Sequence, residues 1–153
     1  MRLLVAVVGK PRNAALAEAI SEYETRAARY WPLEVHEVRE ERAAGMTAAI
    51  VKEREGARLL ERAGAARIVA CDAGGKSFTS EEFSSWLQKE REAGRDTAFV
   101  IGGAFGLSND VLSKSAAKIS LAPWTLPHEL ARLVLAEQLY RAGTIVRGEP
   151  YHK

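Results

Sequence analysis

Residues 121–153 read LAPWTLPHELARLVLAEQLYRAGTIVRGEPYHK, and this stretch indicates more about the fold than any other part of the chain. A loop with Pro and Trp comes first, at Leu121–Leu126. A long apolar helix is expected over Pro127–Ile145, because proline suits the first turn of a helix. The sequence then reaches Tyr151, His152 and Lys153. Chain ends are normally expendable, so a tail with three functional side chains is a candidate for function.

A glycine-rich segment upstream is the second informative feature. Ile101–Ser108 reads IGGAFGLS and follows the apolar, β-branched run Thr97–Ile101. Glycines after a strand let a ligand approach the backbone, and open α/β sheets bind ligands at the carboxyl ends of their strands. The GGxxG spacing disfavours a dinucleotide-binding domain, and the absence of a following GK[ST] disfavours a P-loop. A tight strand-to-helix turn without a ligand is the alternative.

The rest of the chain alternates apolar runs with helical patterns. Strands are expected at Leu3–Val8, Leu33–Val38, Arg67–Cys71, Thr97–Ile101 and Lys118–Leu121, and helices at Asn13–Tyr30, Thr47–Arg62, Ser80–Ala93, after Ser108 and at Pro127–Ile145. Thr79 and Glu82 have the spacing of a capping box. This alternation predicts an α/β fold with a parallel sheet flanked by helices on both faces, and the length of 153 residues predicts a single domain over residues 1–153.

Composition narrows the class of protein. With 47% hydrophobic and 27% charged residues, the chain has the make-up of a soluble globular protein. One cysteine excludes an intrachain disulfide, and the three histidines lack metal-ligand spacing, so we expect no metal. No apolar run is long enough to cross a bilayer, and no cleavage site follows MRLLVAVVGK, so we expect a cytoplasmic protein with no membrane contact. Residues 111–153 carry six Lys and Arg against three Asp and Glu, which is compatible with a polyanionic partner.

Several side chains are candidates for binding or chemistry. Cys71 and Asp72 follow a strand; we interpret Cys71 as a small apolar wall residue and not as a nucleophile. Leu121–Leu126 offers apolar side chains and backbone groups to a flat heterocycle, although a loop with a core Trp fits equally well. In the tail, Tyr151 suits stacking on a base and His152 suits proton transfer, and a disordered tail is the alternative.

The predicted last helix has apolar residues on more than one face. This pattern indicates burial, and a second subunit is one way to provide it. Glu137 and Arg141 lie four residues apart, so they can pair with each other on the helix surface.

Taken together, these segments resemble the family of bacterial ribosomal RNA large-subunit methyltransferases H over the whole chain. The resemblance is carried by LLVAVVGK near the N-terminus, SEYETR at Ser21–Arg26, KEREG at Lys52–Gly56, FVIGGAFGLS at Phe99–Ser108, TLPHELARLVLAEQLYRA at Thr125–Ala142 and the final RGEPYHK. It implies a SPOUT-class α/β fold with a C-terminal deep trefoil knot, a homodimer, and an S-adenosylmethionine site close to the subunit interface. It further implies methylation of N3 of a pseudouridine in helix 69 of 23S rRNA, and we expect assembled ribosomes to be the substrate.

The resemblance also implies roles for particular residues. The positions that correspond to cofactor contacts are Cys71, Gly102, Leu121, Ala122, Pro123, Trp124, Thr125 and Leu126. Relatives usually have Leu at position 71, and they vary at position 124. Tyr151 and His152 match the family tail and are implied to engage the RNA nucleotide.

The N3 proton of the base must leave, which needs a base or a stabilising cation. His152 is the first candidate for this base. Arg132, from either subunit, is a candidate for stabilising the negative charge that develops on the substrate. Glu137 is a weaker candidate for the base, and a structural pair with Arg141 is the alternative role for it. Two other functions stay open: ribose 2′-O-methylation by a SPOUT enzyme, and a non-catalytic ribosome-associated factor.

Overall fold

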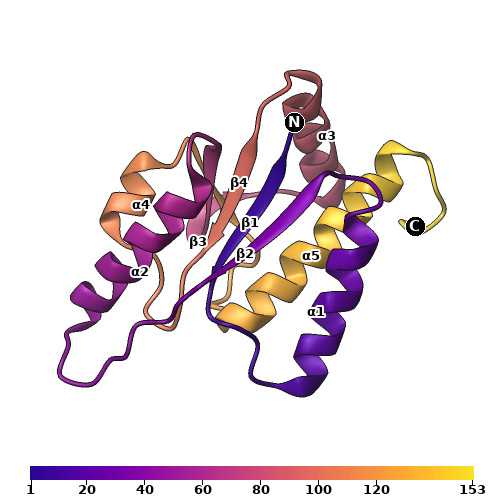
Figure 1. Cartoon of the computed structure of the whole chain (residues 1–153). Coiled ribbons are helices and arrows are strands. Elements are labelled where there is room, and N and C mark those ends of the chain that lie inside the picture. The colour runs from indigo at the N-terminus through magenta and orange to yellow at the C-terminus, as the bar shows by residue number, and fades with distance from the viewer.

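A computed structural model describes residues 1–153 and shows strands and helices alternating along the chain (Figure 1). In chain order the elements are β1 (Leu3–Val8), α1 (Ala14–Ala27), β2 (Leu33–Val38), α2 (Ala48–Ala63), β3 (Arg67–Ser77), α3 (Ser80–Glu92), β4 (Thr97–Ile101), α4 (Asn109–Lys114), β5 (Ala117–Ser120) and α5 (His128–Val146). The predicted α/β class is therefore confirmed.

The five strands form one sheet in the order β2-β1-β4-β3-β5, and every neighbouring pair is parallel. Strand β1 is internal to the sheet and pairs on both sides, with Val5 opposite Val35 of β2 and Phe99 of β4. Because all strands run the same way, the segments that follow β3, β4 and β5 emerge at one edge of the sheet. Parallel sheets of this kind gather their ligand sites at that edge.

Alternate residues of the central strands enter two separate cores. On one face, Leu3, Val5 and Val7 of β1 belong to a cluster that includes Leu135 and Leu139 of α5. On the other face, the intervening residues of β1 join a cluster with residues of α2 and α4. Figure 1 shows the same layers, with α1, α3 and α5 on one side of the sheet and α2 and α4 on the other. This double burial explains why the strands read as continuous apolar runs.

The predicted boundaries hold for most elements, but β3 differs. The strand was expected to end at Cys71 and instead continues to Ser77, with a register irregularity between Cys71 and Lys76, both of which lie opposite Ile119 of β5. A Cβ atom on Gly75 would lie 2.6 Å from the backbone nitrogen of Ile119, so β3 can approach β5 this closely only with glycine at that position.

Helix ends follow the local sequence signals. The Thr79–Glu82 capping box is present at the start of α3, as its spacing predicts. Helix α1 ends at Ala27, earlier than the expected Tyr30. Helix α5 packs closely against the turn after α1, because Gly143 leaves room for Tyr30, whose Cβ would be 2.4 Å from an added Cβ. The indole N–H of buried Trp31 donates to the Leu139 carbonyl at 2.8 Å and ties this contact together.

Candidate active site

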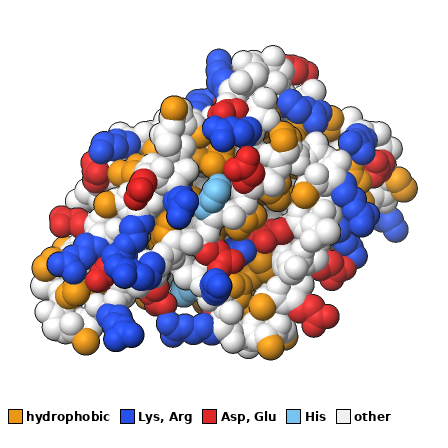
Figure 2. Space-filling model, in the orientation of Figure 1, with side chains coloured by type: hydrophobic (Ala, Val, Ile, Leu, Met, Phe, Trp, Pro, Cys, Tyr) orange, Lys and Arg blue, Asp and Glu red, His pale blue; other side chains and the backbone are white.

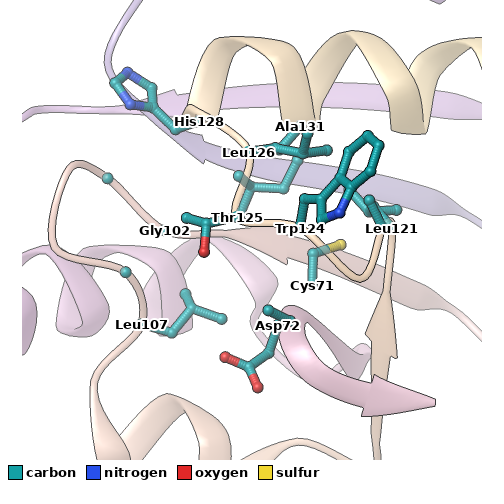
Figure 3. A pocket seen from close by; sticks show the side chains of 15 residues that line it. Cys71, Asp72, Gly102, Leu107, Leu121, Trp124, Thr125, Leu126, His128 and Ala131 are labelled. Carbon is teal, nitrogen blue, oxygen red and sulfur yellow. The ribbon is translucent and has the colours of Figure 1, made fainter. Parts of the chain in front are cut away.

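A pocket lies at one edge of the sheet, and its walls come from Cys71–Ala73, where β3 becomes irregular, and from the segments that follow β4 and β5 (Figure 3). It has a volume of about 190 Å³. Its lining residues are Cys71, Asp72, Ala73, Ile101, Gly102, Gly103, Gly106, Leu107, Leu121, Ala122, Trp124, Thr125, Leu126, His128 and Ala131. Ligand pockets usually measure about 300 Å³ or more, so a cofactor seated here would extend beyond the mouth.

The glycine loop forms one wall by folding tightly on itself. The Gly106 N–H donates to the Gly103 carbonyl at 3.0 Å, and Gly106 has a φ of 84°, a conformation that favours glycine. A Cβ on Gly102 would lie 2.5 Å from the backbone carbon of Gly106. The loop therefore depends on glycine at two positions, and it leaves the Gly102 backbone facing the pocket (Figure 3).

The loop between β5 and α5 forms the opposite wall. The Ser120 hydroxyl donates to the Ala122 carbonyl at 2.7 Å and fixes the turn out of β5. Leu121 and Leu126 are partly buried and pack against the main core, which gives the wall an apolar surface. Trp124 stands at the rim and is 79% exposed, so it is the most exposed large hydrophobic residue in the structure.

Cys71 and Asp72, where the pairing of β3 with β5 becomes irregular, differ in their chemistry. The Asp72 carboxylate accepts a hydrogen bond from the Gly74 N–H at 3.1 Å and lies apart from the apolar wall. Cys71 packs against the core, and burial raises the pKa of its thiol to about 12. The thiol is therefore protonated at neutral pH, which suits a wall residue and not a nucleophile.

Arg132 lies one turn into α5 and does not line the pocket. It is 7% exposed, and its guanidinium contacts Glu24 of α1 at 2.7 Å and Glu37 of β2 at 3.2 Å. Burial alone would lower the pKa of Arg132, but the two carboxylates more than offset this and raise it above its ordinary value. Arg132 thus stays charged and ties α5 to two other elements.

The C-terminal tail is ordered against α5. The Tyr151 ring lies 4.5 Å from the ring of Tyr140, and its hydroxyl donates to Glu137 at 3.0 Å. His152 has one ring nitrogen 2.9 Å from Glu81 of α3 and the other 3.2 Å from Arg141. The alternative of a disordered tail is therefore wrong.

Glu137 is the centre of this tail cluster. It accepts hydrogen bonds from the Arg141 Nε at 3.0 Å and from Tyr151, so the predicted Glu137–Arg141 pair is present. Burial, with hydrogen bonds to Tyr23 and Glu137, raises the pKa of Tyr151 above its ordinary value. A helix rises about 1.5 Å per residue, so Arg141 lies about 20 Å along α5 from His128 at the pocket. The tail therefore lies far from the pocket of its own chain.

The structure brings seven of the eight expected cofactor residues to one pocket. Pro123 is the exception, since it does not line the pocket. The three expected catalytic residues, His152, Arg132 and Glu137, lie outside it. The expectation missed Leu107 and Ala131, which line the pocket. Ala131 lies one turn after Pro127, so the helical period of α5 offered a signal for it.

Comparison with models of known protein families identifies the class of protein to which this chain belongs. The family model described as "Predicted SPOUT methyltransferase" matches residues 1–152, nearly the whole chain. The protein is a member of the SPOUT class, and membership implies the trefoil knot at its C-terminal half.

Close relatives narrow the class to one family. The chain is 58% identical to "Ribosomal RNA large subunit methyltransferase H" of Gemmatimonas aurantiaca, and the match covers 100% of both chains. It is 46% identical to the protein of the same name from an Anaeromyxobacter species, again over 100% of both. The chain belongs to the ribosomal RNA large subunit methyltransferase H family.

Solved structures share the fold at low sequence identity. A structure titled as a probable methyltransferase from Bordetella pertussis Tohama I aligns with a TM-score of 0.58 at 15% identity, covering 92% of this chain and 95% of the other. A structure described as a probable methylase family protein from Haemophilus influenzae Rd KW20 aligns with a TM-score of 0.57 at 11% identity, covering 99% of this chain and 70% of the other. None of the helices has the length and hydropathy of a membrane span, and no cluster of three or more His, Cys, Asp or Glu has a metal-binding arrangement.

Proposed function

We propose that this protein uses S-adenosylmethionine to methylate N3 of a pseudouridine in helix 69 of 23S rRNA, on assembled ribosomes in the cytoplasm. The observation that carries the proposal is the pocket formed by Cys71–Ala73 and by the segments after β4 and β5, in a chain whose family is named for methylation of large-subunit rRNA. A structure from Legionella pneumophila with a TM-score of 0.50 was solved with bound cofactor SAM.

The pocket residues fit such a cofactor. Apolar side chains of Leu121 and Leu126 suit the faces of an adenine ring, and the glycine loop leaves the Gly102 backbone open to polar ligand atoms. Asp72 at the pocket edge is a hydrogen-bond acceptor for ribose hydroxyls or an amino group. When bound, S-adenosylmethionine supplies a methyl group activated by a positively charged sulfur.

The protein must then hold the base in line and remove its N3 proton. His152 is the proposed base, because a neutral imidazole nitrogen can accept the proton that the N3 imide must lose. In its own chain His152 lies between Glu81 and Arg141, far from the pocket. We therefore propose that the enzyme works as a homodimer in which the tail of one subunit serves the pocket of the other, with Tyr151 against the RNA.

Arg132 and Glu137 have less direct proposed roles. Arg132 is held by Glu24 and Glu37, so any stabilisation of negative charge on the base must compete with those pairs. Glu137 already accepts hydrogen bonds from Tyr151 and Arg141, so it fixes the tail in place and is less suited to act as a base. We propose that both act chiefly by positioning.

A basic surface is available for RNA. Figure 2 shows Lys and Arg side chains gathered at the lower left, where Figure 1 has α2 and the segment before it. That region contains Arg39, Arg42, Lys52, Arg54, Arg58 and Arg62, of which Arg54 and Arg58 pair with Glu41. Two copies of such a surface in a dimer suit a folded RNA, whose phosphates attract cations whatever the sequence.

The proposal is tested with labelled S-adenosylmethionine and three substrates: 70S ribosomes, 50S subunits and free 23S rRNA. We expect transfer to assembled ribosomal particles and little to free RNA. The same assay separates the non-catalytic alternative, since a factor without enzymatic activity would show no transfer to any of the three substrates. Calorimetry with S-adenosylmethionine adds a second test, because no binding would favour the factor.

A further inference from the structure

Glu55 of α2 is a buried carboxylate outside the pocket. The residue is 2% exposed, and its Oε2 accepts a hydrogen bond from the Glu41 N–H at 3.1 Å. Its Oε1 is buried and has no hydrogen-bond partner. Such a buried unpaired oxygen costs on the order of 1–3 kcal/mol, more when charged, so it calls for a physical reason.

The glycine loop rests directly on this carboxylate. A Cβ on Gly103 would lie 2.8 Å from Oε1 and 3.2 Å from Oε2 of Glu55. The next helix residue holds the other end of the loop, since a Cβ on Gly56 would lie 2.5 Å from the Ser108 Oγ. Helix α2 therefore supports the loop from the face opposite the cofactor pocket.

The loop has donors that match the unpaired acceptor. The backbone N–H groups of Ala104 and Phe105 donate no hydrogen bond, although both residues line one groove together with Glu55. Phe105 is 47% exposed at the tip of the loop. The free acceptor Oε1 of Glu55 and the two free N–H donors of the loop thus lie in the same groove.

The groups around Glu55 leave its Oε1 in need of a hydrogen-bond donor. Burial, the largest effect, raises the pKa of the Glu55 carboxyl, and Glu40 and Glu41 raise it further. The Glu41 N–H and Arg58 oppose this, but Arg58 is engaged by Glu41. No arginine pairs with Oε1 in the structure: Arg12, in the same groove, binds Glu40, and Arg58 binds Glu41, so a backbone N–H of the loop can serve as its partner.

We propose that Glu55 is a positioning residue for methyl transfer: in the cofactor-bound enzyme its Oε1 accepts a hydrogen bond from the Ala104 or Phe105 N–H and so holds Gly102 and Gly106 against the cofactor. The inference rests on the proposed S-adenosylmethionine site. The structure described above does not contain this bond, and under the proposal cofactor binding selects the arrangement that does.

Hydrogen exchange of the loop amides tests the inference, with S-adenosylhomocysteine as the probe. We expect the wild-type amides of Ala104 and Phe105 to exchange at least about tenfold more slowly when the probe is bound. Glu55→Gln offers one acceptor oxygen in place of two, so it can serve Glu41 or the loop but not both. This variant should lose the protection and bind the probe about tenfold more weakly, while the exposed-face controls Glu53→Gln and Glu61→Gln match wild type.

The possible results distinguish a failure of this inference from a failure of the proposed function. Probe binding without protection of these amides in wild type overturns the inference alone, and so does a Glu55→Gln variant that keeps both protection and affinity. A lower melting temperature with unchanged affinity and exchange would make Glu55 merely structural, which also overturns it. No binding of the probe to wild type overturns the proposed function and this inference with it. If Glu55→Gln does not fold, the wild-type exchange result decides.

Discussion

Gly102 lies where the glycine loop has no room for a side chain. A Cβ there would meet the backbone of Gly106 at 2.5 Å, and backbone cannot rotate away as a side chain can. We expect Gly102→Ala to weaken S-adenosylmethionine binding at least about tenfold and to destabilise the fold by about 1–3 kcal/mol. Gly74→Ala is the control, because its Cβ would meet only the Asp72 side chain, at 3.1 Å. Calorimetry and thermal unfolding measure both effects, and equal affinities for the two variants would contradict the assigned wall.

His152 carries the proton-transfer hypothesis. We expect His152→Ala to lower methyl transfer by a factor of about 100 or more while cofactor affinity stays within about twofold of wild type, since general bases contribute about 10²–10⁴. Single-turnover rates on ribosomes and calorimetry measure the two quantities. Unchanged turnover would remove His152 from the mechanism.

Trp124 provides an optical test of the pocket mouth. It is 79% exposed, whereas Trp31 is 1% exposed and Trp86 is partly buried. Binding of S-adenosylhomocysteine should shield Trp124 from acrylamide, so quenching of the tryptophan fluorescence should fall. In Trp124→Phe the same addition should leave quenching unchanged. Equal quenching of wild type with and without the probe would place the ligand elsewhere.

At the scale of elements, Arg132 joins α5 to α1 and β2. Removing its charge leaves Glu24 and Glu37 without their shared partner, so Arg132→Met should destabilise the fold by about 3 kcal/mol. Urea unfolding measures this loss. Turnover measured well below the melting temperature then separates a structural role from a catalytic one: a folded variant with near-normal turnover would rule out charge stabilisation by Arg132.

At helix α2, the buried carboxyl group of Glu55 should make the free energy of unfolding depend on pH. The pKa of Glu55 is raised in the folded state, so folding favours its protonated form. Its contribution is present in full below the unfolded-state pKa and is lost as pH rises through the raised folded-state pKa. We expect Glu55→Gln to remove that fall in stability, as measured by urea unfolding from pH 4 to pH 8 (about the range in which a raised Glu titrates). A variant with the wild-type slope would contradict the assignment.

The elements themselves were largely predictable, and the reasons are local. Continuous apolar runs such as Leu3–Val8 match strands buried on both faces, and the Thr79–Glu82 spacing marked the start of α3. The extension of β3 through Asp72–Ser77 was not predictable, because a stretch with two glycines is typical of a turn. Its strand conformation depends on β5, which pairs with it from more than 40 residues away in the sequence.

At the scale of the whole molecule, the pocket could be anticipated and the tail could not. Cys71 of β3 and the segments after β4 and β5 lie at the same edge of the parallel sheet, so Cys71, Gly102 and Leu121 meet as expected. The docking of Tyr151 on Tyr140 depends on the length and direction of α5, which no local pattern encodes. The strand order likewise came only from the structure, and the knot is implied only by family membership.

The distance between tail and pocket predicts complementation between subunits. Leu126→Glu should disable the pocket, and His152→Ala should disable the tail. If each tail serves the partner pocket, a mixed dimer has one pocket and one tail that work together. Random mixing in equal amounts should therefore restore about one quarter of wild-type turnover per site. Each variant alone should stay inactive, and no recovery on mixing after subunit exchange would contradict catalysis across the interface.

The central claim is tested most directly by locating the transferred methyl group. Ribosomes that lack the modification are incubated with the purified protein and S-adenosylmethionine bearing a deuterated methyl group, and the digested 23S rRNA is analysed by mass spectrometry. The predicted result is one labelled nucleoside, a pseudouridine of helix 69 that carries the label on N3. Label on a ribose 2′-oxygen, label on another base, or no label in the rRNA would contradict the assignment.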